Sequence, residues 1–384
     1  MKIIFLSFEL FLFSPLFFSQ SSEIVITSQS SGYQVTSLSG YGFENNNLTT
    51  VSNFSNSNPA LMTEMPSFSF GISKQFNSDI NGSYDITYSQ ALNWIPQSAG
   101  LLVSFGEFRL GAGMSQLYNS AIDLEPIPVT TIDQPDGTGE YFDFTSKTSI
   151  ITSSLLAAYP LHNLFSSDDL LSLGAQLNLN FIHHKESLWK VLIKSDSHEL
   201  SGKIGFNYKF SETLPLTQLS AFYEKGFKNQ NPWTAEDPAP DRVGIDSGRI
   251  SALIPITFSL TSYVPDKLSL GILFQTTEKF IITGNISNIF WNSYQQNIHN
   301  QIEFSSSFIY KWENFITTSA GIYLTNRDYI TEYTYNEGSA VFLSLGTIIN
   351  LSGFNIEAVL ADSHLFSEEL RKQTLIKIGL NIFT

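Results

Sequence analysis

The six histidines and the absence of cysteine mean that a metal site would need histidine and carboxylate ligands. His183 and His184 are adjacent, and neighbouring residues of a strand point to opposite faces, so they cannot bind one metal ion together. His198 follows across a short loop and could pair with either of them. We favour the simpler interpretation that these histidines hold no metal ion.

The motifs of common enzyme classes are missing from this chain. It has no Gly-x-Ser-x-Gly elbow, no phosphate-binding P-loop and no His-Glu-x-x-His zinc motif. The lack of cysteine also excludes disulfide scaffolds, iron–sulfur clusters and a cysteine nucleophile. Serine, histidine and acidic residues are all present, but no spacing specifies a catalytic set. We therefore expect no enzymatic activity and no cofactor.

Acidic side chains gather in two proline-containing segments. Clustered carboxylates can bind divalent cations, whereas a solvated loop can carry the same charges merely as mutually repelling groups. Both interpretations remain open from the sequence, and we favour the solvated loop. The acidic residues are Asp123, Glu125, Asp133, Asp136, Glu140 and Asp143 in the first segment, and Glu236, Asp237, Asp241 and Asp246 in the second.

Composition excludes further classes. The 384 residues include 20 basic and 35 acidic ones, which gives a net charge of −15, and charged residues make up only 14%. Such a chain does not resemble a nucleic-acid-binding protein, because affinity for phosphate backbones needs clustered basic residues. Aromatic residues also make up 14%, which is too many for a disordered acidic chain. The mean hydropathy of +0.01 shows that apolar and polar residues balance.

Apolar and polar residues alternate with a period of two in many segments, which predicts that β-strands carry these side chains. In Gly202–Phe210, Ile204 and Phe206 share one face, and Lys203 and Asn207 share the other. Strict alternation is typical of strands with one apolar and one polar face. Similar alternation occurs in Phe68–Ser73, Leu173–His183 and Ile376–Ile382.

Two architectures share this pattern, a soluble β-sandwich and a membrane β-barrel with its apolar face outward. The polar faces here are rich in Ser, Gly, Asn and Gln rather than Lys and Glu, which suits a crowded lumen. Many predicted strands are also longer than the usual five or so residues of sandwich strands. We therefore predict an all-β fold, a transmembrane antiparallel β-barrel.

The first residues predict export. Lys2 precedes a largely apolar run, Ile3–Phe18, and Ser19 and Ser21 suit a cleavage site, so residues 1–21 are interpreted as a signal peptide. An N-terminal membrane anchor is the less favoured alternative, because Glu9 and a proline interrupt the run. With a barrel, export predicts the bacterial cell outer membrane as the location.

The connections between predicted strands alternate in length, as in outer-membrane barrels with short periplasmic turns and long extracellular loops. The short ones include Pro265–Lys267, and the number of strands is left open between 14 and 16. Asn81–Ala91 could merely extend the first strand, and Ile250–Tyr263 with Leu268–Gln275 adds one hairpin that is hard to place. The long connections are Asn119–Phe144, Lys228–Gly248 and Arg327–Ser339.

Residues 22–64 do not alternate and contain too little apolar surface for a core of their own, so we predict an N-terminal hatch that plugs the lumen of a barrel formed by residues 65–384. A flexible periplasmic tail is the alternative. The motif Asn58-Pro59-Ala60 would form the hatch turn, with proline setting the backbone and asparagine capping it.

The chain resembles the FadL/TodX family of outer-membrane transporters. The similarity rests on Ser31–Gln34, on Ser55–Met62 with its Asn58-Pro59-Ala60 centre followed by Phe68–Gly71, on Ile289–Tyr294, and on the last strand, Leu375–Phe383. The resemblance implies 14 strands, a hatch and passive transport of hydrophobic compounds such as long-chain fatty acids or aromatic hydrocarbons. The chain departs from the family in its Asn- and Ser-rich stretch before the motif.

Ligand-contacting residues follow less directly. Lys203, Lys209 and Arg109 lie on predicted polar faces, where a cation could receive a fatty-acid carboxylate, although we favour ordinary pairing with acidic neighbours. Ile127, Val129 and Trp233 could line an apolar groove in the loops. The alternative function is a FadL-like binding or shuttle component of a surface protein-secretion system, whose partners would be secreted proteins. A general porin is less favoured because of the hatch.

Overall fold

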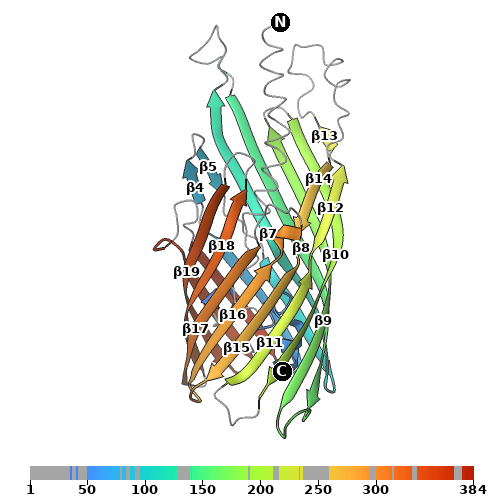
Figure 1. The fold of residues 1–384 in the computed structure, drawn as a ribbon, viewed down its shortest axis with the longest axis vertical. Coiled ribbons are helices and arrows are strands. Elements are labelled where there is room, and N and C mark those ends of the chain that lie inside the picture. Colours follow the sequence, from blue (N-terminus) through green and yellow to red (C-terminus); the bar gives the residue numbers. More distant parts are fainter. Residues whose placement is uncertain are drawn as a thin grey trace.

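The computed structural model describes residues 35–36, 40–41, 50–77, 80–83, 87–90, 96–128, 139, 141–188, 191–210, 216–232, 234–236, 259–293, 300–313, 315–330, 335–366 and 374–384. Within them the chain forms a closed antiparallel barrel with 14 strand positions (Figure 1). The predicted barrel, with the 14 strands that the resemblance implies, is therefore confirmed, whereas the predicted signal peptide lies outside the described residues. Among the described residues, no helix has the length and apolar character needed to cross a membrane.

Several strand positions of the wall consist of more than one strand segment. In chain order the positions are β3 with β4, β5 with β6, β7, β8, β9, β10, β11 with β12 and β13, β14 with β15, and then β16 to β21 singly. The bounds are β3 Phe68–Asn77, β4 Ile80–Ser83, β5 Thr87–Gln90, β6 Pro96–Phe105, β7 Phe108–Pro128, β8 Tyr141–His162, β9 Leu170–Leu188, β10 Val191–Lys209, β11 Leu216–Lys225, β12 Phe227–Pro232, β13 Thr234–Glu236, β14 Ser259–Val264, β15 Lys267–Gln275, β16 Phe280–Ile289, β17 Gln301–Glu313, β18 Ile316–Ile330, β19 Tyr335–Leu351, β20 Phe354–Asp362 and β21 Thr374–Phe383.

The barrel closes through β21 and β3, in a register that runs from Leu375 opposite Asn77 to Phe383 opposite Ser69. Closure leaves the wall without a free sheet edge between its first and last strands. Outside the wall, β1 (Val35–Thr36) and β2 (Gly40–Tyr41) pair as a small two-stranded sheet. Their backbones lie near β17 to β21.

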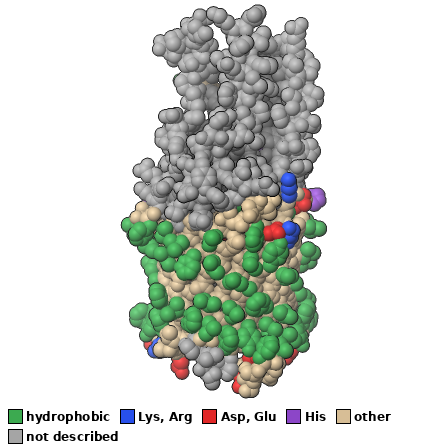
Figure 2. Space-filling model, viewed as in Figure 1, with side chains coloured by type: hydrophobic (Ala, Val, Ile, Leu, Met, Phe, Trp, Pro, Cys, Tyr) green, Lys and Arg blue, Asp and Glu red, His purple; other side chains and the backbone are tan. Residues whose placement is uncertain are grey.

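Alternation along each strand separates an apolar outer face from a polar inner face, as the sequence predicts for a membrane barrel. On β21, Ile376, Ile378 and Leu380 are exposed, whereas Lys377 and Asn381 are buried. A soluble sandwich would show the opposite arrangement. On the face shown in Figure 2, hydrophobic side chains are spread over the outer surface of the described barrel, and charged side chains lie mainly near its two ends.

Two segments left the strand count open in the sequence, and in the structure both belong to strand positions that bend. β4 and β5 extend β3 and β6 and pair with each other, so Asn81–Ala91 adds no position to the wall. Likewise β14 continues into β15, and the prediction of a short turn at Pro265–Lys267 is wrong. Pro265 has no backbone N–H to donate to the ladder. At this bend Asp266 Oδ1 accepts a hydrogen bond from the backbone nitrogen of Gly226, 2.9 Å away, which lies between β11 and β12.

The turn between β8 and β9 is organised by one carboxylate. Asp169 accepts hydrogen bonds from the backbone nitrogens of Leu164, Phe165 and Ser166 at 2.8 to 3.0 Å, and from Tyr208 Oη at 2.7 Å. Burial raises the pKa of Asp169, but these hydrogen bonds together lower it by more than burial raises it. The pKa of Asp169 therefore lies below its ordinary value. The turn is thus held by an ionised side chain at neutral pH.

Candidate functional site

Residues Thr50–Met65, called the inner segment below, lie inside the barrel. Most of their side chains are buried, and they contact inward-facing residues of strands on several sides of the wall. The inner segment is the described part of the predicted hatch. The rest, residues 22–49, lies outside the described residues apart from β1 and β2.

A buried ion pair binds the first residues of the inner segment. Glu357 on β20 and Lys377 on β21 lie 3.3 Å apart, and both side chains are fully buried. Glu357 accepts hydrogen bonds from Thr50 Oγ1 at 2.7 Å and from Ser52 Oγ at 2.9 Å. Lys377 donates to Asn53 Oδ1. One carboxylate and one ammonium therefore fix three polar residues at the start of the inner segment to the wall.

The middle of the inner segment fits against glycines of the wall. Phe54 packs on Gly100, Gly111 and Gly113, and a Cβ atom added at Gly100 would overlap its ring. A bare backbone is required here because the ring approaches the strand closely. Together with its neighbours, Phe54 forms an apolar cluster inside the lumen, consisting of Val51, Phe54, Met62, Met65, Leu102, Leu156 and Ala158.

The Asn58-Pro59-Ala60 motif begins a short 3₁₀ helix, Pro59–Glu64. Asn58 is its N-cap, and its Oδ1 accepts from the backbone nitrogen of Ala60 at 3.0 Å. The Asn58 amide also donates to the backbone oxygens of Phe206 and Ala221 at 2.9 and 3.0 Å. The same side chain therefore shapes the turn and fastens it to β10 and β11, a double role that alanine could not fill.

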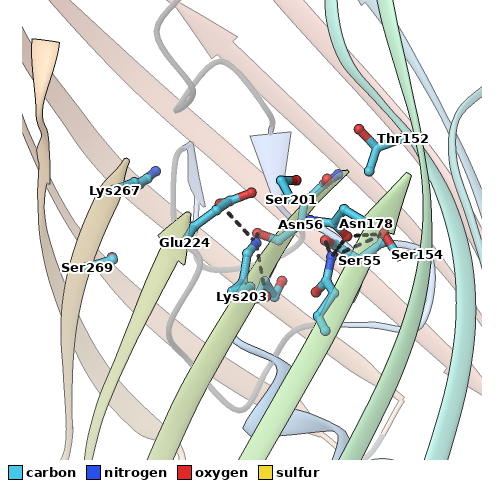
Figure 3. Close-up of polar contacts among 12 residues, drawn as sticks. Ser55, Asn56, Thr152, Ser154, Asn178, Ser201, Lys203, Glu224, Lys267 and Ser269 are labelled. Carbon is cyan, nitrogen blue, oxygen red and sulfur yellow. Dashed lines mark hydrogen bonds and ion pairs between the residues drawn. The ribbon is translucent and has the colours of Figure 1, made fainter. Parts of the chain in front are cut away.

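Lys203 holds the inner segment from β10 (Figure 3). Its Nζ donates to the backbone oxygens of Asn56 and Ser57 at 3.2 and 3.5 Å, and lies 3.3 Å from Glu224 Oε2. The ammonium also lies 4.8 Å from the ring centroid of Phe222. The favoured prediction of ordinary pairing is therefore correct for Lys203.

The other two predicted basic residues differ from each other. Lys209 Nζ lies 2.9 Å from Glu64 Oε2, so it too is paired, and its partner belongs to the inner segment. Arg109 lies at the short-turn end of β7 and donates to the backbone oxygen of Gly106 at 2.9 Å. The structure thus brings Lys203 and Lys209 to the inner segment but gives Arg109 only a turn contact.

Several predicted features lie wholly or partly outside the described residues. Val129 and Trp233 lie outside the described residues, as do the side chain of Ile127 and most of both acidic segments. His183 and His184 do point to opposite faces, and His183 Nδ1 lies 2.7 Å from Asp196 Oδ1. Among the described residues, no group of three or more His, Asp or Glu side chains is arranged to hold a metal ion.

The sequence did not single out Glu224 or the buried pair Glu357 and Lys377. A signal was present, because each is the one charged residue among the apolar and small polar residues of its strand's inward face. A second such pair, Lys267 and Glu303 at 3.3 Å, lies elsewhere on the inner wall. These pairs were missed because strand register, rather than sequence spacing, brings their members together.

The described ladder of the wall is interrupted on one side of β10. β10 pairs with β11 from Gly202 to Lys209 and with β13 from Leu192 to Lys194. Between these two stretches, over residues 195–201, no ladder is described on that side, although β12 lies close to β10 there and pairs with β14 on its other side. The Lys203–Glu224 pair lies at the lower edge of this interruption.

The fold is similar to that of several solved outer-membrane proteins. The toluene transporter TodX of Pseudomonas putida superposes with a TM-score of 0.62 at 13% identity, covering 92% of this chain and 96% of that one. The toluene transporter TbuX of Ralstonia pickettii gives 0.60 at 12% identity, covering 93% and 97%. A FadL homologue of Pseudomonas aeruginosa gives 0.58 at 12% identity, covering 85% and 92%. In sequence, no family model and no curated protein matches the chain. The FadL/TodX resemblance is therefore confirmed in the fold.

Proposed function

We propose that this protein is a passive channel of the bacterial outer membrane for hydrophobic compounds, with the inner segment as its hatch. The observation that carries the proposal is a polar-lined barrel whose lumen is occupied by a segment held through a few separate anchors. A hatch must leave without unfolding the barrel, and each anchor is a side-chain contact rather than a shared strand ladder. The structural neighbours are transporters of hydrophobic small molecules, which supports this class of ligand.

The charge pattern of the lumen favours uncharged ligands over fatty acids. Lys203, Lys209, Lys267 and Lys377 each have a carboxylate partner within 3.3 Å. A ligand carboxylate would have to displace one of these partners and leave it unpaired in a poorly solvated site, which is costly. We therefore place aromatic hydrocarbons ahead of long-chain fatty acids as ligands.

The proposed route starts at the long-loop end and passes the apolar cluster around Phe54. Two methionines in that cluster, Met62 and Met65, have flexible side chains that can adapt to varied apolar ligands. The interrupted ladder beside β10 supports a lateral exit through the wall rather than an exit past the hatch to the periplasm. Because no nucleotide motif is present, release relies on two hatch states with different ligand affinity.

Uptake of radiolabelled toluene and oleate tests the proposal in cells that lack other routes for these compounds. The protein should accelerate toluene uptake, and oleate uptake to a smaller extent, over cells with an empty vector. Pro59→Gly should still yield a folded barrel but change the uptake rate, because glycine loosens the hatch turn. Wild-type protein that inserts normally yet gives no uptake above the vector would refute the proposal.

The alternative of a secretion shuttle is not favoured, since the structural neighbours are channels for small molecules. The two functions predict different companions after purification from outer membranes. A channel should retain lipids or hydrocarbons that mass spectrometry can identify, whereas a shuttle should retain secreted proteins in stoichiometric amounts.

A further inference from the structure

Two carboxamides buried in the inner wall have no hydrogen-bond partner among the described residues. They belong to Asn207 on β10 and Gln218 on β11, whose exposed fractions are 0% and 1%. The nitrogen and the oxygen of both amides are unpartnered. Gln218 lies opposite Lys209, two residues along the inward face from Asn207, so the two amides are diagonal neighbours in one ladder. Buried amides are nearly always paired, and two adjacent exceptions point to a group that joins them in another state of the protein.

The 3₁₀ helix of the inner segment begins and ends on either side of Asn207. Its N-cap Asn58 lies on Gly205, where an added Cβ atom would overlap the Asn58 amide. Its last residue, Glu64, pairs with Lys209 at 2.9 Å. Gly205, Asn207 and Lys209 are successive inward positions of β10. The helix therefore covers Asn207, and moving the helix away would uncover this amide.

The inner wall beside Gln218 is apolar. Leu273 on β15 lies opposite Gln218. It packs with Ile281 and Ile309 in a buried cluster, which faces the lumen because the neighbouring Phe308 is exposed on the outer face. One strip of wall thus carries carboxamides at one end and aliphatic side chains at the other. Such a surface suits a ligand with an apolar body and one group that both donates and accepts a hydrogen bond.

We propose that this strip is a binding site for neutral aromatic compounds that carry a hydroxyl group, and that it becomes accessible when the 3₁₀ helix moves. The aromatic ring would pack on Leu273 and the other two members of its cluster. The hydroxyl group would donate a hydrogen bond to one carboxamide oxygen and accept one from the nitrogen of the other carboxamide.

The two states of the hatch then differ in their affinity for such a ligand. With the helix in place both amides are enclosed and unpartnered, which is unfavourable, and a ligand that bonds to them is compatible only with a displaced helix. A hydroxylated ligand therefore shifts the hatch toward its open state, whereas a hydrocarbon of similar size gains no hydrogen bond there. The inference rests on the proposed function and deepens it, because it names a ligand class that displaces the hatch.

Hydrogen exchange of the purified full-length protein in lipid vesicles tests this site, with p-cresol and toluene as probes that differ by one hydroxyl group. At the same concentration, p-cresol should accelerate the amide exchange of residues 60–64 about tenfold more than toluene, as one net hydrogen bond allows. Asn207→Leu combined with Gln218→Met should remove this difference while the barrel stays folded, because apolar groups of similar shape replace unpartnered amides at little cost. Each single substitution should lower the difference to about threefold, so the test does not depend on the double variant. The matched control is Asn285→Leu, which removes a buried wall amide already bonded to Ser287 at 3.3 Å and should retain the difference.

Equal acceleration by the two compounds in the wild type would overturn the inference, and so would a difference that persists in the Asn207/Gln218 variant. Loss of the difference in Asn285→Leu as well would assign it to the wall in general, which also contradicts the site. If neither compound changes the exchange, and the variant exchanges more slowly than wild type without ligand, the two amides bind only water and the inference is wrong. Failure of the proposed function is distinguishable, since wild-type protein would then give no toluene uptake above the vector, whatever the exchange shows.

Discussion

Glu357 Oε1 and Lys377 Nζ lie 3.3 Å apart on β20 and β21, and the exposed fractions of their side chains are 0% and 1%. The two residues stand diagonally across the ladder, in which Glu357 faces Gly379 and Lys377 faces Val359. The absence of a side chain at Gly379 gives the carboxylate its space, since a Cβ atom there would overlap it. The pair therefore serves the inner segment and the wall at once.

Glu357→Gln should lower the free energy of unfolding by about 3 kcal/mol, because it leaves the Lys377 ammonium buried without a counter-charge. The double variant Glu357→Leu with Lys377→Leu should lose less, since it buries no charge. Urea titrations followed by tryptophan fluorescence in lipid vesicles measure both. If Glu357→Gln were as stable as wild type, the remaining Lys377 ammonium would have to be in contact with water, which would contradict the prediction.

Gly100→Ala should loosen the inner segment while leaving the barrel intact, because the added methyl overlaps Phe54. Overpacking of this kind costs about 1 to 3 kcal/mol. Hydrogen exchange of the amides of residues 51–57 should accelerate about tenfold or more, and ion conductance in planar bilayers should rise. Gly284→Ala is the control, since its Cβ would lie at an ordinary 3.4 Å from Ile272.

Asn58→Ala should release the start of the 3₁₀ helix. It removes the N-cap, worth about 1 kcal/mol, and both hydrogen bonds to the carbonyls of β10 and β11. Faster amide exchange at Ala60 and Leu61 is the expected signature. Asn56→Ala is the matched control, because Asn56 contributes its backbone oxygen rather than its side chain to the Lys203 contact. Equal effects of the two substitutions would argue against a special role for Asn58.

The lowered pKa of Asp169 predicts how the stability of the protein depends on pH. Its pKa lies below the ordinary value, so its stabilising effect is complete above about pH 4, where the unfolded carboxyl is ionised, and is lost as the pH falls through the folded pKa. Asp169→Asn should therefore be less stable than wild type at pH 7, and this difference should shrink under acid. A difference that is independent of pH would exclude this assignment.

The sequence predicted the barrel well because alternation is local, as along β10 from Lys203 to Lys209. The sequence did not decide between 14 and 16 strands, because the same residue types occur at a bend within a strand and at a turn between two strands. Pro265 and Asp266 look like a turn, yet in the fold they bend one wall position beside Gly226.

The site was predicted only in part. Asn58-Pro59-Ala60 carries local signals for a cap and a turn, and these need no knowledge of the wall. Glu357 and Lys377 are 20 positions apart, and only the register of β20 and β21 brings them together against Ser52 and Asn53. The path of the inner segment across Gly100 likewise depends on closure of the barrel, which sequence spacing does not encode.

The gating claim is tested most directly by locking the inner segment to the wall. Thr63 Oγ1 and Ser172 Oγ are 2.6 Å apart, so cysteines there would lie within reach of a disulfide, and the native chain has no cysteine to interfere. Uptake of radiolabelled toluene by the variant Thr63→Cys with Ser172→Cys is the measurement. The account predicts low uptake in the oxidised form and recovery to the wild-type rate after reduction, with neither single variant affected. Equal uptake by the oxidised and reduced forms would contradict it.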